Sequence, residues 1–238
     1  YPAEQCIHEL FEQQVERTPE AVALVYEAEQ VSYRELNERA NQLVRALSRR
    51  GVAKGDAIAL LCSNRPEFAV AYAAALRGGL RLTCINWHLQ RDEIAYIVDN
   101  CEARAFLADA RFADAAAEVA RESHKASVRL AIAGPIEGFE SFEAALDAES
   151  AADVESPVLG GTMLYTSGTT GRPKGVYRRQ APPASRLAQS ISQVSKYQPD
   201  GDRMLCTGPL YHAAPLAFNL AAPLAASIGT VLMDRWDA

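Results

Sequence analysis

The sequence lacks the features of a membrane protein, a disulfide-stabilised domain or a common metal site. Its 238 residues include no apolar run long enough to span a bilayer. The 5 cysteines contain no CxxC pair, and the 4 histidines contain no HExxH spacing. Because the cysteine number is odd and no leader sequence is evident, we expect reduced thiols, a cytoplasmic location and no protein site for a metal.

Basic residues are also fewer than acidic residues. The chain carries 24 Lys and Arg against 30 Asp and Glu, which gives a formal net charge of −6. A general affinity for the polyanionic backbone of nucleic acid is therefore not expected. Hydrophobic residues make up 49% and charged residues 23% of the chain, the balance of an ordinary globular protein. We expect small-molecule partners, and neither nucleic acid nor a membrane.

Apolar runs alternate with helical patterns along most of the chain. Ser32 and Glu35 form a predicted capping box for a helix over 33–50, and Gly51 ends that helix. The intervening strands are continuously apolar, which favours an α/β fold with mainly parallel sheets covered by helices. Further strands are expected at 21–26, 57–62, 80–85, 105–108, 128–131, 204–207 and 230–233. Further helices are expected at 8–16, 66–76, 91–100, 112–122, 187–196 and 214–226, with a short one around Phe142 in a polar connector.

The run from Tyr165 to Val176 (YTSGTTGRPKGV) is the most informative part of the sequence. It follows an apolar segment that reads as the end of a strand. Glycines allow backbone N–H groups to approach an anion, and hydroxyl groups donate to phosphate oxygens without adding charge. Lys174 adds a mobile positive charge. The run therefore predicts a polyphosphate-binding loop.

Two other interpretations of this loop are weaker. A Walker-type loop requires glycine directly before the lysine and a hydroxyl residue after it, whereas Pro173 and Gly175 occupy these places. The second alternative is a flexible surface loop without function. Ordinary loops, however, rarely combine so many phosphate-compatible groups directly after a strand.

The loop resembles the phosphate-binding signature of the adenylate-forming (AMP-binding) superfamily, whose pattern is Tyr or Phe, Thr-Ser-Gly-Thr-Thr-Gly, any residue, Pro-Lys-Gly. The chain matches that pattern throughout. The resemblance implies that the loop binds the phosphates of ATP, with Mg2+ sharing the charge, while a carboxylate attacks the α-phosphorus. In acyl-CoA synthetases the acyl group then passes to CoA. The phosphate-binding residues implied are Thr166, Ser167, Gly168, Thr169, Thr170, Gly171 and Lys174.

A second candidate site follows the strand expected at 204–207. The sequence alone favours a simple structural role for His212 at the start of a helix. Acyl-CoA synthetases, however, often carry Pro-Leu-Tyr-His or a close variant here, and the histidine borders the acyl carboxylate and the adenylate. The resemblance thus implies an acyl and adenylate pocket that includes Tyr211, His212, Ala213 and Phe218. The apolar stripe of Leu216, Ala217, Phe218, Leu220 and Leu224 fits either that pocket or plain core packing.

The class of carboxylic acid substrate can be inferred from the absence of an acidic residue near His212. Amino-acid-activating domains usually place an aspartate in this region, because a buried ammonium group requires a carboxylate partner. No acidic residue occurs from Gly208 to Ala226. A fatty or other uncharged acid is therefore the expected substrate. The segment from His8 to Asn37 nevertheless resembles peptide-synthetase adenylation domains, so amino-acid adenylation stays open as the alternative.

By resemblance, residues 1–238 form an incomplete N-terminal AMP-binding domain, with 1–150 as a first αβ region and 151–238 carrying the phosphate loop and the acyl pocket. The C-terminal lid domain and its catalytic lysine would lie beyond Ala238. No catalytic residue and no metal ligand is expected within the chain. We therefore expect it to be inactive alone. A non-enzymatic nucleotide-binding fragment is the remaining alternative.

Overall fold

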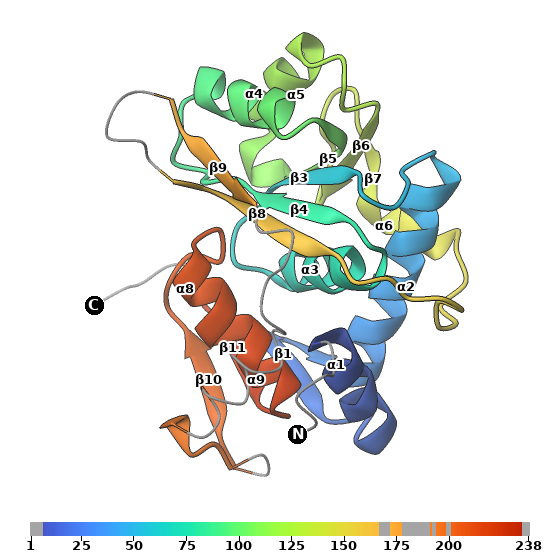
Figure 1. The fold of residues 1–238 in the computed structure, drawn as a ribbon, viewed down its shortest axis with the longest axis vertical. Helices are drawn as coiled ribbons and strands as arrows, with labels where there is room; N and C mark the ends of the chain where they lie inside the picture. Colours follow the sequence, from blue (N-terminus) through green and yellow to red (C-terminus); the bar gives the residue numbers. More distant parts are fainter. Residues whose placement is uncertain (1–6, 167–171, 178–190, 192–193, 199–200, 235–238) are drawn as a thin grey trace. The chain divides into compact units, whose positions relative to one another are not determined.

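The computed structural model describes residues 7–166, 172–177, 191, 194–198 and 201–234 (Figure 1). The chain divides into two compact units. The first comprises Tyr1–Glu38, Asn64–Val70 and Arg179–Ala238, and the second comprises Arg39–Ser63 and Ala71–Arg178. Helices α2 (Tyr33–Arg49) and α3 (Pro66–Arg77) contribute residues to both units. The mixed α/β architecture predicted from the sequence is confirmed.

The first unit contains a four-stranded sheet in the order β10-β11-β1-β2. Strand β1 pairs antiparallel with β2 and parallel with β11, which in turn pairs parallel with β10. Ala23 and Leu24 of β1 are fully buried, as the apolar sequence of this strand requires. The bounds are α1 (Ile7–Arg17), β1 (Val22–Tyr26), β2 (Glu29–Ser32), β10 (Arg203–Cys206) and β11 (Gly229–Leu232).

The helix expected at 214–226 is not a regular α-helix. It consists of α8 (Ala213–Pro215), a π-helical segment η2 (Leu216–Ala221) and α9 (Ala222–Ala225). Pro223 cannot donate to the carbonyl four residues earlier, at Asn219, and its ring crowds that carbonyl. The Asn219 carbonyl instead accepts a hydrogen bond from Thr230 Oγ1 at 3.2 Å. Proline thus explains why the helix widens where periodicity predicted a continuous one.

The second unit contains a seven-stranded sheet in the order β7-β6-β5-β3-β4-β8-β9. Its pairs are parallel except for β8 with β9, which are antiparallel. Mainly parallel pairing was predicted and is confirmed. The bounds are β3 (Ala57–Leu61), β4 (Arg81–Cys84), α4 (Arg91–Asn100), β5 (Ala103–Asp109), η1 (Ala110–Phe112), α5 (Ala113–Glu122), β6 (Val128–Ile132), β7 (Glu140–Ser141), α6 (Phe142–Asp147), β8 (Gly161–Thr166) and β9 (Lys174–Tyr177).

Helices α4 and α5 cover one face of this sheet, where Figure 1 shows them side by side. Their apolar residues Ile94, Ile97 and Val119 pack in one buried cluster with Leu61 of β3 and Phe106 of β5. Each of these side chains is at most 2% exposed. Met163 and Tyr165 of β8 pack against the same cluster. The core of this unit therefore extends to the strand that leads into the predicted phosphate-binding loop.

Helix α2 begins at the capping box predicted from the sequence. The Ser32 amide donates to Glu35 Oε2 at 2.8 Å, and the Glu35 amide donates to Ser32 Oγ at 3.1 Å. These reciprocal bonds satisfy backbone donors that a helix start leaves unpaired. The cap is thus a feature that two residues, three positions apart, determine locally.

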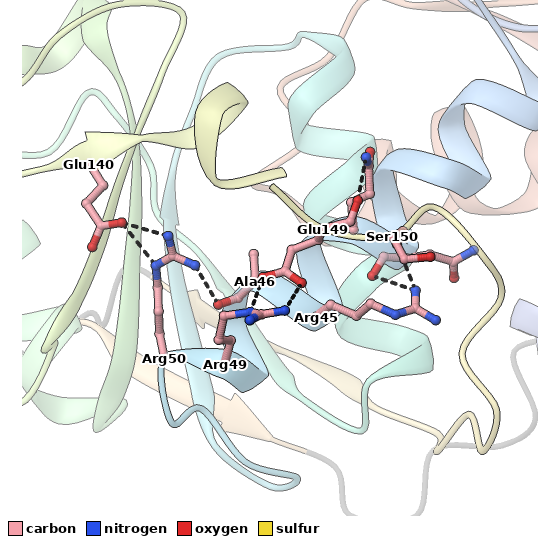
Figure 2. A network of polar contacts seen from close by, with 9 residues as sticks. Arg45, Ala46, Arg49, Arg50, Glu140, Glu149 and Ser150 are labelled. Atoms are coloured by element: carbon pink, nitrogen blue, oxygen red, sulfur yellow. Dashed lines mark hydrogen bonds and ion pairs between the residues drawn. The ribbon is translucent and has the colours of Figure 1, made fainter. Parts of the chain in front are cut away.

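The later turns of α2 hold the connector that precedes β8 (Figure 2). Arg45 donates to the carbonyls of Ser150 and Ala152 at 3.0 and 2.5 Å, and Arg49 forms a two-point ion pair with Glu149 at 2.6 and 2.9 Å. Arg50 pairs with Glu140 of β7. The forked guanidinium group suits such multiple contacts. Side-chain contacts thereby hold residues 149–152, the part of the connector that follows α6.

Two short strands were not predicted. The sequences of β7 and β9 are polar or contain glycine, and they therefore predict a connector and a loop instead of strands. The helix expected over 187–196 falls mostly outside the described residues. Among the residues that the structure describes, no helix has the length and apolar character needed to cross a membrane.

Candidate functional site

The first group of candidate residues lies on the hairpin of β8 and β9. Thr166 is directly opposite Lys174 in this antiparallel pair, and Tyr165 is opposite Gly175. Directly opposed residues project from the same face of a hairpin, and successive residues alternate between faces. Thr166 and Lys174 therefore share one face, and Tyr165 belongs to the other. The structure thus brings together two of the predicted phosphate-binding residues.

Gly175 makes room for the ring of Tyr165. A Cβ atom placed on Gly175 would lie 2.9 Å from Tyr165 Cζ and would also collide with Met163 Cε. Any larger residue would force these two side chains away from the core against which they pack. The glycine after the lysine therefore leaves room for the packing of these two side chains, a role that the phosphate-binding pattern by itself does not reveal.

Both ends of the loop contact helix α4. Tyr165 donates a hydrogen bond to Asn100 Oδ1 at 2.6 Å, and the Arg172 guanidinium lies 5.1 Å from the ring centre of Tyr96. The second distance is typical of a cation–π contact. Partial burial raises the pKa of the Tyr165 hydroxyl, which keeps it protonated as a donor. The contacts of Tyr96 and Asn100 were not predicted, because no motif in the residues around them indicates a contact with the distant loop.

Thr166 and Lys174 are both exposed. The Thr166 hydroxyl is 3.5 Å from the Lys174 carbonyl, to which it donates, and no described carboxylate forms an ion pair with Lys174. An exposed ammonium beside a hydroxyl, without an acidic neighbour bound to it, fits a polyanionic ligand. The other predicted phosphate-binding residues, Ser167, Gly168, Thr169, Thr170 and Gly171, lie outside the described residues.

The second group of candidate residues follows strand β10. Tyr211 is buried, and burial raises the pKa of its hydroxyl. His212 is exposed at the N-cap of α8, and its ring centre lies 4.6 Å from that of Tyr211. Ala213 is exposed as well. The tyrosine thus anchors the segment while the histidine is accessible to a ligand.

The apolar stripe expected nearby has two kinds of members. Leu216, Leu220 and Leu224 are buried and serve as core residues of the first unit. Phe218 is 47% exposed, which leaves it available for contact with an apolar ligand. Of the two interpretations of the stripe, core packing therefore describes the three leucines. The hairpin residues and the Tyr211–His212 segment belong to different units.

Metal ligands are not evident in this part of the protein. Within the described ranges, no group of three or more His, Cys, Asp or Glu side chains could hold a metal ion. Cys84, Cys101 and Cys206 are buried free thiols, and Cys62 is buried as well. Burial raises the pKa of Cys84, Cys101 and Cys206, so these thiols are poor nucleophiles and poor ligands at neutral pH.

The model of the AMP-binding enzyme family matches residues 11–238. The chain belongs to this family. That membership agrees with the signature between Tyr165 and Gly175 and with the fold around it.

A peptide antibiotic synthase and a CoA ligase are both among the curated relatives of this chain. The chain is 31% identical over 230 residues to bacitracin synthase 1 of Bacillus licheniformis, covering 91% of this chain and 4% of that protein. It is 31% identical over 185 residues to a medium/long-chain-fatty-acid–CoA/3-oxocholest-4-en-26-oate–CoA ligase of Mycobacterium marinum, covering 73% and 34%. The chain thus spans a minor part of each relative's length.

A solved structure with a similar fold is that of the anthranilate CoA ligase AuaEII in complex with anthranoyl-AMP. The TM-score is 0.89 at 22% sequence identity, and the match covers 99% of this chain and 46% of that one. At this identity the likeness establishes the fold alone. The expected architecture of an adenylate-forming enzyme's N-terminal domain is therefore confirmed.

Proposed function

We propose that this chain forms part of an enzyme that activates a carboxylic acid with ATP and then transfers the acyl group to CoA. The observation that carries the proposal is the pair of Thr166 and Lys174. These residues are exposed, lie opposite each other on one hairpin face and belong to the family signature. The proposal takes the family's use of ATP and assigns the phosphate contacts to this hairpin.

In the first half-reaction a carboxylate oxygen attacks the α-phosphorus of ATP. A new P–O bond forms, the bond from the α-phosphorus to the bridging oxygen breaks, and pyrophosphate leaves. Lys174 neutralises charge on the β- and γ-phosphates, and Thr166 donates a hydrogen bond there. Catalysis of this kind depends mainly on positioning and charge neutralisation. Mg2+ would accompany the phosphates, and we assign it no ligand among the described residues.

The acid is proposed to bind beside Tyr211, His212 and Ala213, with its tail toward Phe218. An uncharged acid suits this segment, because no acidic residue from Gly208 to Ala226 could pair with an α-ammonium group. The similarity to the fatty-acid–CoA ligase supports this substrate class. CoA as the acyl acceptor rests on the same similarity.

Amino-acid adenylation is the second candidate function. It is favoured by the similarity to bacitracin synthase 1, which extends over 91% of this chain. If that function applies, the partner for an α-ammonium group must come from outside residues 208–226. The two candidates share the chemistry of the hairpin and differ in the acid.

Pyrophosphate release by the intact protein tests the proposal. Matched fatty, aryl and amino acids are offered with ATP, and CoA is added in a second series. The proposal predicts release with fatty or aryl acids and an acyl-CoA product. Preference for an amino acid, with no CoA ester formed, would support the second candidate instead.

A further inference from the structure

Asn64 is the most fully bonded polar side chain near the segment that carries His212. Its Nδ2 group donates to the carbonyls of Gly208 and Met233 at 2.9 and 3.1 Å. Its Oδ1 atom accepts a hydrogen bond from the Leu210 amide at 2.9 Å. All of these residues belong to the first unit. One amide side chain thus joins the turn after β10 to the end of β11.

The position of Asn64 makes these bonds costly to lose. The residue is 7% exposed, and Leu210 is fully buried. A buried backbone amide or carbonyl that loses its partner keeps the full cost of its desolvation. The ends of β10 and β11 are otherwise tied here by the Met233 amide, which donates to the Cys206 carbonyl at 3.2 Å. Asn64 therefore determines the path of the turn that follows.

The turn leads directly to the candidate site. The His212 amide donates to the Pro209 carbonyl at 3.1 Å, and the Leu216 amide donates to the His212 carbonyl at 3.0 Å. His212 is thus fixed by backbone bonds between the turn and the first turn of α8. Because Asn64 holds Gly208 and Leu210 on either side of Pro209, a change at Asn64 moves the backbone from which Tyr211 and His212 project.

We propose that Asn64 is a positioning residue for the acid-binding segment, acting through the turn at Gly208–Leu210 on Tyr211 and His212. The inference rests on the proposed function, in which this segment binds the carboxylic acid. Asn64 itself needs no contact with the substrate. Its role is distinct from that of Lys174, which acts on the phosphates.

Steady-state kinetics of the intact protein test this role with Asn64→Ala and Asn64→Asp. The aspartate keeps the shape and the acceptor for the Leu210 amide but loses both Nδ2 donors. For Asn64→Ala we expect the KM for the acid to rise about tenfold or more, while the KM for ATP changes less than about twofold. Asn64→Asp is expected to shift the same constant in the same direction and is assayed if the alanine variant does not fold.

Asn41→Ala is the matched control. Asn41 is likewise a buried asparagine, with no exposed surface, and its Nδ2 donates to the Ala151 carbonyl and to Asp153 Oδ1 at 3.2 and 2.9 Å, within the second unit. It should lower the melting temperature without a selective effect on the KM for the acid. Equal changes in both KM values for the Asn64 variants, or none, would overturn the proposal.

Amide hydrogen exchange supplies a measurement that does not depend on activity. Exchange in a peptide covering residues 207–213 should quicken in the Asn64 variants and stay unchanged in Asn41→Ala. Unchanged exchange at this turn would contradict the role of Asn64 whatever the substrate is. If the wild-type protein proves to activate only amino acids, the proposed substrate class fails, and the KM test of Asn64 is carried out with that amino acid.

Discussion

The exposure of the Lys174 side chain determines whether its substitution affects stability or ligand binding. The side chain is exposed and pairs with none of the described carboxylates, so its removal leaves no gap in the core. A charge-assisted contact to phosphate is worth about 1.5–3 kcal/mol, which corresponds to roughly ten- to a hundredfold in binding. The residue should therefore affect the use of ATP and leave stability unchanged.

For Lys174→Ala in the intact protein we predict that kcat/KM for ATP falls by about ten- to a hundredfold, with an unchanged melting temperature. Thr166→Val, which removes a neutral donor from the same hairpin face, should have a smaller effect. The measurement is ATP-dependent kinetics beside thermal unfolding. A large fall in melting temperature would mean that the lysine supports the fold, and unaltered kinetics would remove it from the phosphate site.

Substitution of Gly175, unlike that of Lys174, should lower stability, because the neighbouring side chains leave no room for a Cβ atom there. In Gly175→Ala the new Cβ would meet the ring of Tyr165 and the methyl group of Met163. We predict a loss of about 1–3 kcal/mol in the free energy of unfolding, together with a raised KM for ATP, since the displaced ring carries the bond to Asn100. Gly201→Ala is the control, because a Cβ there has no atom within 4 Å. Equal stability of the two variants would refute this account of the hairpin.

Among the secondary-structure elements, helix α2 shows how polar contacts organise a connector. The ion pair with Arg49 lowers the pKa of Glu149 below its ordinary value of 4.5. A carboxyl group whose folded pKa is lowered stabilises the protein above its unfolded pKa, and this contribution is lost as the pH falls through the folded value. Only the acid limb of the stability profile should therefore depend on Glu149.

We predict that Glu149→Gln makes the free energy of unfolding less dependent on pH below about 4.5, because the wild-type carboxyl group binds its proton at a higher pH in the unfolded chain than in the folded one. Chemical denaturation at a series of pH values from neutral to acid measures this slope. Glu118→Gln serves as a comparison. The Glu118 carboxylate is half-exposed, and its distance of 3.8 Å from Arg91 is long for an ion pair, so its removal should have little effect on this slope. An identical slope in wild type and Glu149→Gln would show that the pair does not link folding to pH.

The elements also show what local sequence can and cannot predict. The capping box at Ser32 and Glu35 was predictable because its partners lie three positions apart. The π-helical segment was not predictable from the apolar periodicity, because that periodicity does not express the missing N–H group and the ring of Pro223. Strand β9 was missed because its pairing with β8 is not evident from a run containing Gly175. Each miss reflects a steric or pairing constraint that hydrophobicity does not express.

For the whole molecule, the sequence allowed the fold class and the family signature to be predicted, but not the arrangement that supports the site. Asn64 bonds to residues 142 or more positions later in the chain, and Tyr165 bonds to a residue 65 positions earlier. Such contacts depend on the complete fold. Thr166 and Lys174 were identifiable from their residue types and spacing, because that motif is local.

The central claim, acid activation by ATP at the hairpin, is tested most directly by isotope exchange between pyrophosphate and ATP in the intact protein without any thiol acceptor. The account predicts exchange that requires a carboxylic acid and that is greatly reduced in Lys174→Ala. Exchange independent of added acid, or equal exchange in wild type and Lys174→Ala, would contradict it.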